Sequence, residues 1–230
     1  MNHQGQTAPV LTIDGPSGSG KGSISKCVAE KLGWHYLDSG ALYRALGIAA
    51  IKEGVDVANE DALAALIQDI ELEFKRSDLG HWAVFLNGEE VQDQLQTEAV
   101  GNTASKIAVF PKVRSGLLAK QRTFQIAPGL VADGRDMGSV VFPNAKFKVY
   151  LTASAEERGK RRYKQLIEKG INANLSSVIQ DIQERDERDK NRSESPLVIP
   201  EGATYIDSSS SEIDEVVLTV LDLLENTKKL

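Results

Sequence analysis

Short apolar runs alternate with longer segments of helical periodicity from residue 10 onward. This alternation predicts a parallel sheet with helices on both faces, which is the α/β class. The five candidate strands are VLTID at 10–14, WHYLD at 34–38, LVAD at 130–133, FKVYL at 147–151 and TYID at 204–207. The pattern therefore predicts a five-stranded parallel sheet with flanking helices.

The first helix is predicted directly after the first strand, where Ile24, Cys27, Val28 and Leu32 recur at helical spacing. Gly33 follows at the position where a left-handed cap commonly ends a helix. Seven further segments have helical spacing: 39–53, 59–68, 94–109, 111–126, 155–169, 175–192 and 211–227.

One region departs from the alternation of strands and helices. Two strand-like runs, IELEFKR and HWAVFL, are followed by Asn87-Gly88 and then EEV. Asn-Gly supplies the positive φ angles of a tight hairpin, so we expect a small antiparallel β insert here. The pattern leaves open whether the insert is a decorative hairpin or part of a binding site.

Composition limits the remaining possibilities. A chain of 230 residues with 41% hydrophobic residues can bury one core, so a single domain is expected. The net charge of −6 argues against nucleic acid or membrane surfaces as partners. No apolar run is long enough to cross a bilayer, and a single cysteine without a signal-like start favours the cytoplasm. A monomer is the default expectation.

A glycine-rich segment joins the first strand to the first helix. It matches the glycine, four residues, Gly-Lys core of a phosphate-binding loop, in which backbone N–H groups surround an anion and Lys21 reaches the β- and γ-phosphates. The general pattern has Ser or Thr after the lysine, whereas here Gly22 stands there and the hydroxyl follows at Ser23. The candidate loop residues are Gly15, Pro16, Ser17, Gly18, Ser19, Gly20, Lys21, Gly22 and Ser23.

A second anion site is predicted at the same edge of the sheet. The second strand ends in LDSG, with Ser39 at a helix start and Arg44 five residues later, although LDSG alone also fits a simple N-capping turn. The third strand ends in Asp133-Gly-Arg135-Asp136, at the edge where open α/β folds bind ligands. A structural salt bridge between Arg135 and a neighbouring Asp is the alternative.

A cytosine ring presents a donor amine and acceptor N3 and O2 atoms, and a carboxylate, a guanidinium and a hydroxyl complement it. Asp136, Arg114 and Ser105 could form such a set, but nothing in the residues alone selects Ser105, and Ser105 and Arg114 by themselves also fit solvated helix residues.

Two arginine-rich segments follow. EERGKRR carries Arg161 and Arg162, and the next helix places Arg185, Arg188 and Arg192 on one side at spacings of three and four. A solvated helix with local salt bridges is the ordinary explanation. Aligned arginines repel one another unless an anion lies between them, and phosphoryl transfer depends on such cationic groups.

The order of these motifs, IDGPSGSGKGS, LDSGALYR, NTASKIAVFPKVR, DGRDMGSVVFP and ERDERDKNR, closely resembles the bacterial cytidylate kinase family of phosphate-loop nucleoside monophosphate kinases. The resemblance covers nearly the whole chain. It implies a core at about 9–67, 105–154 and 194–230, a monophosphate-binding insert at about 68–104 and a helical lid at about 155–193. It also implies transfer of the γ-phosphoryl group of ATP to CMP or dCMP.

Residue roles follow from the resemblance, position by position. It implies that residues 15–23 hold ATP, with Mg²⁺ near Ser23 and, through water, Asp133. The implied catalytic residues are Lys21, Arg135, Arg161, Arg162 and Arg192. The implied acceptor contacts are Ser39, Arg44, Ser105, Arg114, Arg135, Asp136, Arg185, Asp189 and Arg192, of which Ser105, Arg114 and Asp136 read the base and Arg185 and Asp189 contact the sugar.

Two competing functions remain open. A nucleotide-driven switch or regulatory ATPase would also use a phosphate loop, but it predicts a water-positioning residue, and no Glu follows Asp133 in LVADG. A kinase for another small acceptor, such as UMP or a shikimate-like acid, would differ in whether Asp136 and Arg114 converge on a cytosine edge.

Overall fold

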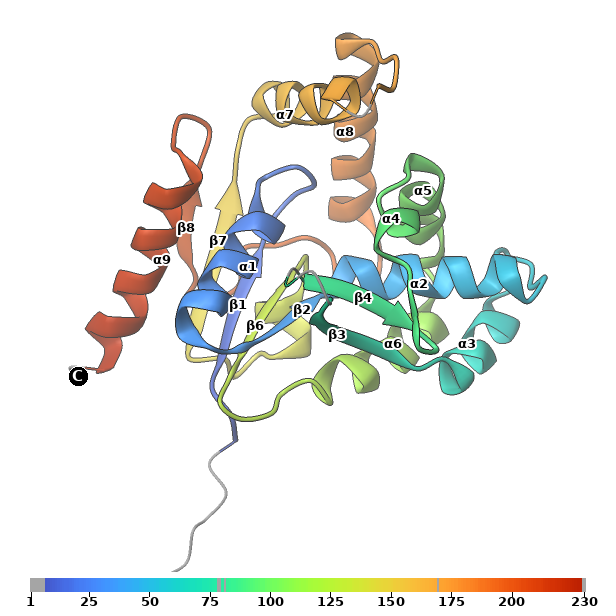
Figure 1. The fold of residues 1–230 in the computed structure, drawn as a ribbon, viewed down its shortest axis with the longest axis horizontal. Helices are drawn as coiled ribbons and strands as arrows, with labels where there is room; N and C mark the ends of the chain where they lie inside the picture. The colour runs from blue at the N-terminus through green and yellow to red at the C-terminus, as the bar shows by residue number, and fades with distance from the viewer. Residues whose placement is uncertain (1–6, 78–79, 81, 169, 229–230) are drawn as a thin grey trace, which may run out of the picture.

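The computed structural model describes residues 7–77, 80, 82–168 and 170–228. Its main sheet is five-stranded and fully parallel (Figure 1). The strand order is β2 (His35–Asp38), β6 (Leu130–Gly134), β1 (Val10–Asp14), β7 (Phe147–Thr152) and β8 (Thr204–Asp207). The predicted α/β class and the five predicted strands are confirmed.

Helices cover both faces of this sheet because the strand side chains alternate between them. Leu11 and Ile13 pack with α1 (Lys21–Leu32) and α9 (Ile213–Lys228) on one face. Val10 packs with the helices of the other face. These are α2 (Ser39–Lys52), α3 (Glu60–Asp69), α5 (Glu98–Ile107) and α6 (Pro111–Arg122). The central strand β1 is buried along its whole length, which holds its carboxyl end in a fixed place.

The predicted antiparallel insert is also confirmed. It consists of β3 (Leu72–Arg76), β4 (Trp82–Leu86) and β5 (Glu89–Glu90), paired in that order. The turn between β4 and β5 has positive φ at Asn87 and Gly88, as the Asn-Gly pair predicts. Residues 78 and 79, in the predicted loop of the hairpin, and residue 81, at the start of the predicted run HWAVFL, lie outside the described residues.

One predicted helix is wrong. The segment 94–109 forms two helices, α4 (Gln92–Leu95) and α5, instead of one. Thr97 separates them because it adopts an extended conformation, and its hydroxyl accepts a hydrogen bond from Val100 N. Thr97 thus caps α5, as an N-cap threonine typically does. The predicted helix 111–126 also ends early, at Arg122, and residues after it continue in tighter turns.

Two helices, α7 (Ala155–Glu168) and α8 (Leu175–Asn191), stand above the carboxyl end of the sheet (Figure 1). They share a small apolar cluster of Leu166, Val178 and Ile182. At Gly159 they approach so closely that an added Cβ would lie 2.3 Å from Ile179 Cγ1. The two helices are therefore packed as one unit. The predicted helix 155–169 is confirmed to Glu168, and residue 169 lies outside the described residues.

A short π-helix, η1 (Met137–Val141), follows β6 and was not predicted. Its first turn is held by Asp14, whose two carboxylate oxygens accept from Met137 N and Gly138 N at 2.8 Å each. Burial raises the pKa of Asp14 to about 7, even though these two N–H donors oppose the shift. The end of β1 thus positions the segment that carries Arg135 and Asp136.

Within the described ranges, no helix combines the length and the apolar character needed to span a membrane.

Candidate active site

The predicted phosphate loop joins β1 to α1, as its motif requires. Two of its glycines have left-handed φ angles, 77° at Gly18 and 88° at Gly20. At Gly15 an added Cβ would lie 1.9 Å from Leu151 O, so only glycine fits beside β7. The loop ends at the N-terminus of α1, where free N–H groups and the helix dipole favour an anion.

Lys21 lies at the base of the loop, where it is buried and its Nζ donates to Pro16 O at 3.1 Å. Burial, together with the nearby charge of Arg135, lowers the pKa of Lys21 to about 7. A buried ammonium group without an anion is unfavourable, so a phosphate bound here would stabilise the charged form of Lys21.

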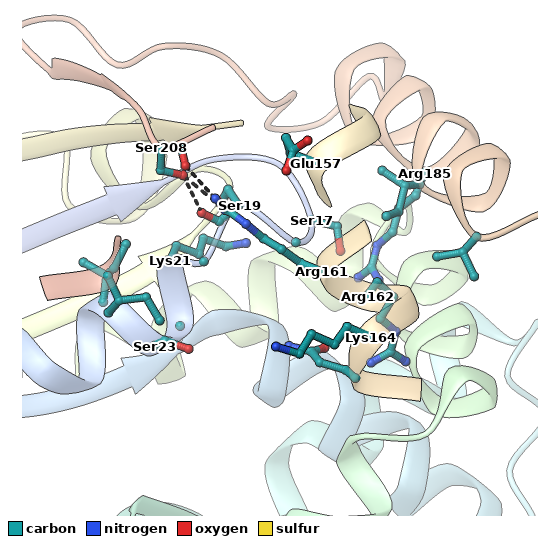
Figure 2. Close-up of a pocket in the computed structure, with 18 of the residues that line it drawn as sticks. Ser17, Ser19, Lys21, Ser23, Glu157, Arg161, Arg162, Lys164, Arg185 and Ser208 are labelled. Atoms are coloured by element: carbon teal, nitrogen blue, oxygen red, sulfur yellow. Dashed lines mark hydrogen bonds between the residues drawn. The ribbon is translucent and has the colours of Figure 1, made fainter. Parts of the chain in front are cut away.

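A cavity of about 820 Å³ opens between the loop and the α7–α8 unit. Figure 2 shows Lys21, Ser17 and Arg161 around this space, with Arg162 and Arg185 on its far side. Arg161 is tied to the opposite wall, because its Nη2 donates to Ser208 O at 2.5 Å. The hydroxyl of Ser208 lies 3.2 Å from Ser19 O, so the segment after β8 also contacts the loop.

Arg158 anchors α7 to the loop. Its guanidinium donates to Ser17 O at 2.9 Å and to both carboxylate oxygens of Asp186 on α8, at 3.1 and 2.5 Å. Its Nε donates to Ala153 O at 2.9 Å. The side chain is 4% exposed, so this bidentate pair is shielded from solvent. Arg158 is not among the predicted site residues, although it lies in the EERGKRR segment.

A second cavity, of about 210 Å³, lies between the loop and the insert. Lys21, Arg44, Asp133, Arg135 and Arg185 all line it. Asp133 pairs with Asp38 across β2 and β6, so two carboxylates lie side by side at the strand ends. Burial and the charge of Asp38 raise the pKa of Asp133. The phosphate loop, the ends of β2 and β6 and the helix α8 therefore all contribute to this cavity.

Most of the other predicted acceptor residues are buried, and none of them lines either cavity. Several are paired with one another or with Arg135. Arg114 makes an ion pair with Asp136, and Arg135 Nε donates to Asp189 Oδ2 at 2.7 Å. Burial opposes the charged form of Asp189, but Arg135 outweighs it and lowers the pKa of that carboxyl. Arg135 therefore does form a salt bridge, but its partner is Asp189 on α8 and not a neighbouring Asp of its own motif.

Ser39 and Arg192 are held by partners that the sequence did not indicate. Gln121 Nε2 donates to Ser39 Oγ at 2.8 Å, and Arg192 Nε donates to Ser195 O at 2.6 Å. Ser105 is half-buried on α5 and lines neither cavity.

Three guanidinium groups of this region carry a buried nitrogen without a hydrogen-bond partner in the described residues: Arg114 Nε, Arg185 Nε and Arg192 Nη2. Burial and the neighbouring charge of Arg135 lower the pKa of Arg185 to about 10. Burial also lowers the pKa of Arg192, next to the like charge of Arg114. Buried donors without acceptors are rare in folded proteins, so these three groups are suited to bind the acceptor atoms of a ligand.

A family model described as cytidylate kinase matches residues 11–226. The chain belongs to the cytidylate kinase family. A cytidylate kinase of Aeromonas salmonicida (strain A449) is 53% identical, and the match covers 96% of this chain and 95% of that protein. For a cytidylate kinase of Serratia proteamaculans (strain 568) the identity is 53%, with 94% and 93% covered.

Among solved structures, a shikimate kinase from Bacteroides thetaiotaomicron aligns with 96% of this chain and 99% of its own at a TM-score of 0.46 and 12% identity. This likeness is too distant to carry an argument.

Most of the candidate site residues were predicted from motifs that resemble the cytidylate kinase family. The residues that were not predicted are those that bind the candidate site residues and hold them in place. Arg158 and Ser208 contact the phosphate loop. Gln121 contacts Ser39, Tyr36 contacts Asp133, and Asp14 contacts the segment after Asp136. In the sequence, Arg158 and Asp186 are each one charged residue among many in a predicted helix. No local pattern distinguishes Arg158 or Asp186, because Arg158 lies 28 positions from Asp186 and 141 from Ser17.

Proposed function

We propose that this protein transfers the γ-phosphoryl group of ATP to the phosphate of CMP or dCMP, giving ADP and CDP or dCDP. One observation carries the proposal: a phosphate loop and a cluster of buried arginines with unpartnered N–H groups meet at the same edge of the sheet. Membership of the cytidylate kinase family supports the same substrates.

ATP binds with its phosphates in the loop, Gly15 to Ser23, and with Lys21 at the β- and γ-phosphates. The rest of the nucleotide occupies the larger cavity, which extends from the loop to residues 208–213. Arg161 and Arg162 of α7 line the same cavity and complete the cationic wall. Helices α7 and α8, within residues 155–193, act as the lid.

CMP binds with its phosphate among Arg44, Arg135 and Arg192, beside Ser39. Asp136 and Arg114 face the cytosine edge together with Ser105, while Arg185 and Asp189 contact the sugar. In the free protein, Arg114 binds Asp136 and Arg135 binds Asp189. Binding CMP therefore exchanges internal ion pairs for contacts with the ligand, which penalises a base that cannot satisfy both groups. The insert, within residues 68–104, closes this side of the site.

The reaction forms a bond between an oxygen of the CMP phosphate and Pγ, and breaks the bond between Pγ and the β–γ bridging oxygen. The acceptor phosphate is an anion above about pH 6, so no general base is needed. The transition state spreads charge over the equatorial oxygens. That charge is stabilised by five cationic side chains, those of Lys21, Arg135, Arg161, Arg162 and Arg192. The site excludes water, which would otherwise compete with CMP as acceptor.

Mg²⁺ fits the donor set. This ion prefers oxygen ligands and retains several waters, so it needs no closed protein cage. Among the described residues, no group of three or more His, Cys, Asp or Glu side chains forms such a cage. Ser23 lines the larger cavity and Asp133 the smaller one, and they would hold the ion directly and through water, respectively. When bound, the ion neutralises phosphate charge.

The test is ADP formation from ATP and Mg²⁺ with CMP, dCMP, UMP, AMP, GMP and shikimate supplied separately, and with no acceptor. We expect rapid turnover with CMP or dCMP and a rate near the blank with the other acceptors. Equal ADP formation without any acceptor would identify an ATPase or switch instead. Preferred use of UMP or shikimate would remove the base-reading roles of Ser105, Arg114 and Asp136.

A further inference from the structure

The backbone conformation at Gly22, the residue after the loop lysine, does not require a glycine. Gly22 lies in the first turn of α1 and is not among the residues with a left-handed φ angle. A Cβ added at Gly22 would meet nothing closer than 3.9 Å. The two atoms at that distance are Asp133 Oδ2 and Tyr36 Oη. There is therefore room for a serine here, and its hydroxyl would come near the carboxylate of Asp133.

Tyr36 already brings a hydroxyl to this place. Its Oη donates to Asp133 Oδ2 at 2.6 Å, and its side chain is almost fully buried. Both residues line the smaller cavity, together with Lys21 and Gly22. The hydroxyl engages Oδ2, so Oδ1 can accept from water around a bound cation.

The ring of Tyr36 is held by the insert. Phe74 of β3 packs against it edge to face, with ring centroids 6.3 Å apart, and Trp82 of β4 lies tilted against it at 5.7 Å. Lys26 Nζ lies over the ring, 5.7 Å from its centroid. Contacts on several sides leave the ring little freedom, so the direction of the hydroxyl is determined by packing.

We propose that Tyr36 is a positioning residue for Asp133, and that its hydroxyl replaces the one that general phosphate loops carry at the position of Gly22. The inference rests on the proposed function only in taking ATP with Mg²⁺ as a substrate. Tyr36 orients the carboxylate toward the water shell of the ion. The insert, through Phe74 and Trp82, thereby supports the ATP side of the site as well as the acceptor side.

The first experiment compares the wild type with Tyr36→Phe, which keeps the ring and removes the hydroxyl. Calorimetry gives the affinity for ATP with Mg²⁺ and with EDTA, and the affinity for CMP. We expect the Mg²⁺-dependent gain in ATP affinity to fall about tenfold. Affinity for ATP in EDTA and for CMP should stay within about twofold. Tyr205→Phe is the matched control, because Tyr205 is 55% exposed on the edge strand β8.

A rescue variant separates positioning from simple packing. Tyr36→Phe/Gly22→Ser returns a hydroxyl beside Asp133 from the other side, and it should recover most of the lost Mg²⁺-dependent gain. In an Asp133→Asn background, Tyr36→Phe should add almost nothing, because the two residues act as a unit.

Three results would overturn the proposal: an unchanged Mg²⁺ effect in Tyr36→Phe, an equal loss of ATP and CMP affinity with a lower melting temperature, or full additivity with Asp133→Asn. ATP calorimetry requires no acceptor. Failure of CMP as acceptor would therefore leave the Tyr36 result intact, and the two failures are distinguishable.

Discussion

The two ends of the site are built differently. At the proposed ATP end, consecutive residues form the loop, whose main-chain N–H groups would bind an anion beside an open cavity of about 820 Å³. At the proposed acceptor end, the side chains come from several helices and loops, and some bind one another in the free protein, as Arg114 does with Asp136 and Arg135 with Asp189. The first end is defined by backbone geometry, and the second by a balance of buried charges.

This difference has an energetic consequence. A loop of main-chain N–H groups is ready for an anion without rearrangement, so its contribution is largely preorganised. A buried ion pair must separate before a ligand can use either partner, and each partner alone is unfavourable in the protein interior. We therefore expect affinity to come mainly from the ATP end and selectivity mainly from the acceptor end.

Lys21→Met should give the largest effect. It keeps the size of the side chain but removes the charge that meets the β- and γ-phosphates, so kcat should fall roughly 10³-fold. CMP affinity should stay within about twofold, because the variant leaves the arginine cluster intact. Steady-state kinetics and CMP calorimetry check both statements. An equal loss of ATP affinity and CMP affinity would contradict the proposed difference between the two ends.

Asp136→Ala should act on the acceptor end alone. Loss of the carboxylate removes a base contact and leaves the buried charge of Arg114 without its partner, so kcat/KM for CMP should fall roughly 10²-fold. ATP affinity, measured by calorimetry, should change less than about threefold. Asp136→Asn keeps the shape and serves as the control for unfolding. A matching loss of ATP affinity in both variants would contradict the expectation.

Arg158→Lys tests whether the ATP end also depends on a buried side chain. Lysine cannot make the bidentate contact with Asp186 while also donating to Ser17 O, so we expect ATP affinity to fall about tenfold and CMP affinity to hold. Arg122→Lys is the matched control, because Arg122 likewise donates to main-chain oxygens, of Val140 and Val141, away from the loop. If both variants weaken ATP equally, Arg158 has no special relation to the loop.

The smallest effect concerns protons. Burial lowers the pKa of Lys21 to about 7, so the free protein loses the charge of this lysine as the pH rises above neutral. Phosphates favour the charged form, so ATP binding at pH 8 should take up a proton, close to one per site at most, and affinity should fall as pH rises above 7. Calorimetry in buffers of different ionisation enthalpy measures the uptake. It should vanish in Lys21→Met, and uptake that persists there would assign the proton to another group.

Much of the fold follows from local patterns. The parallel strands, the Asn87-Gly88 turn and the end of α1 at Gly33 were all predictable, because each depends on neighbours within a few residues. The single helix predicted at 94–109 failed at Thr97, where a side-chain cap stopped the periodic pattern. The π-helix after Asp136 was not predictable from spacing, since it depends on Asp14, more than a hundred positions earlier.

By itself, the sequence determined the class of fold, the phosphate loop and the family, because these are encoded in contiguous motifs whose geometry is local. Only the tertiary structure decided which buried charges pair and which are left without partners. It paired Arg158 with Asp186 and placed the hydroxyl of Tyr36 beside Gly22. These relations depend on burial and on distances between elements far apart in the chain, and burial is what makes a charge or a hydroxyl costly to leave without a partner.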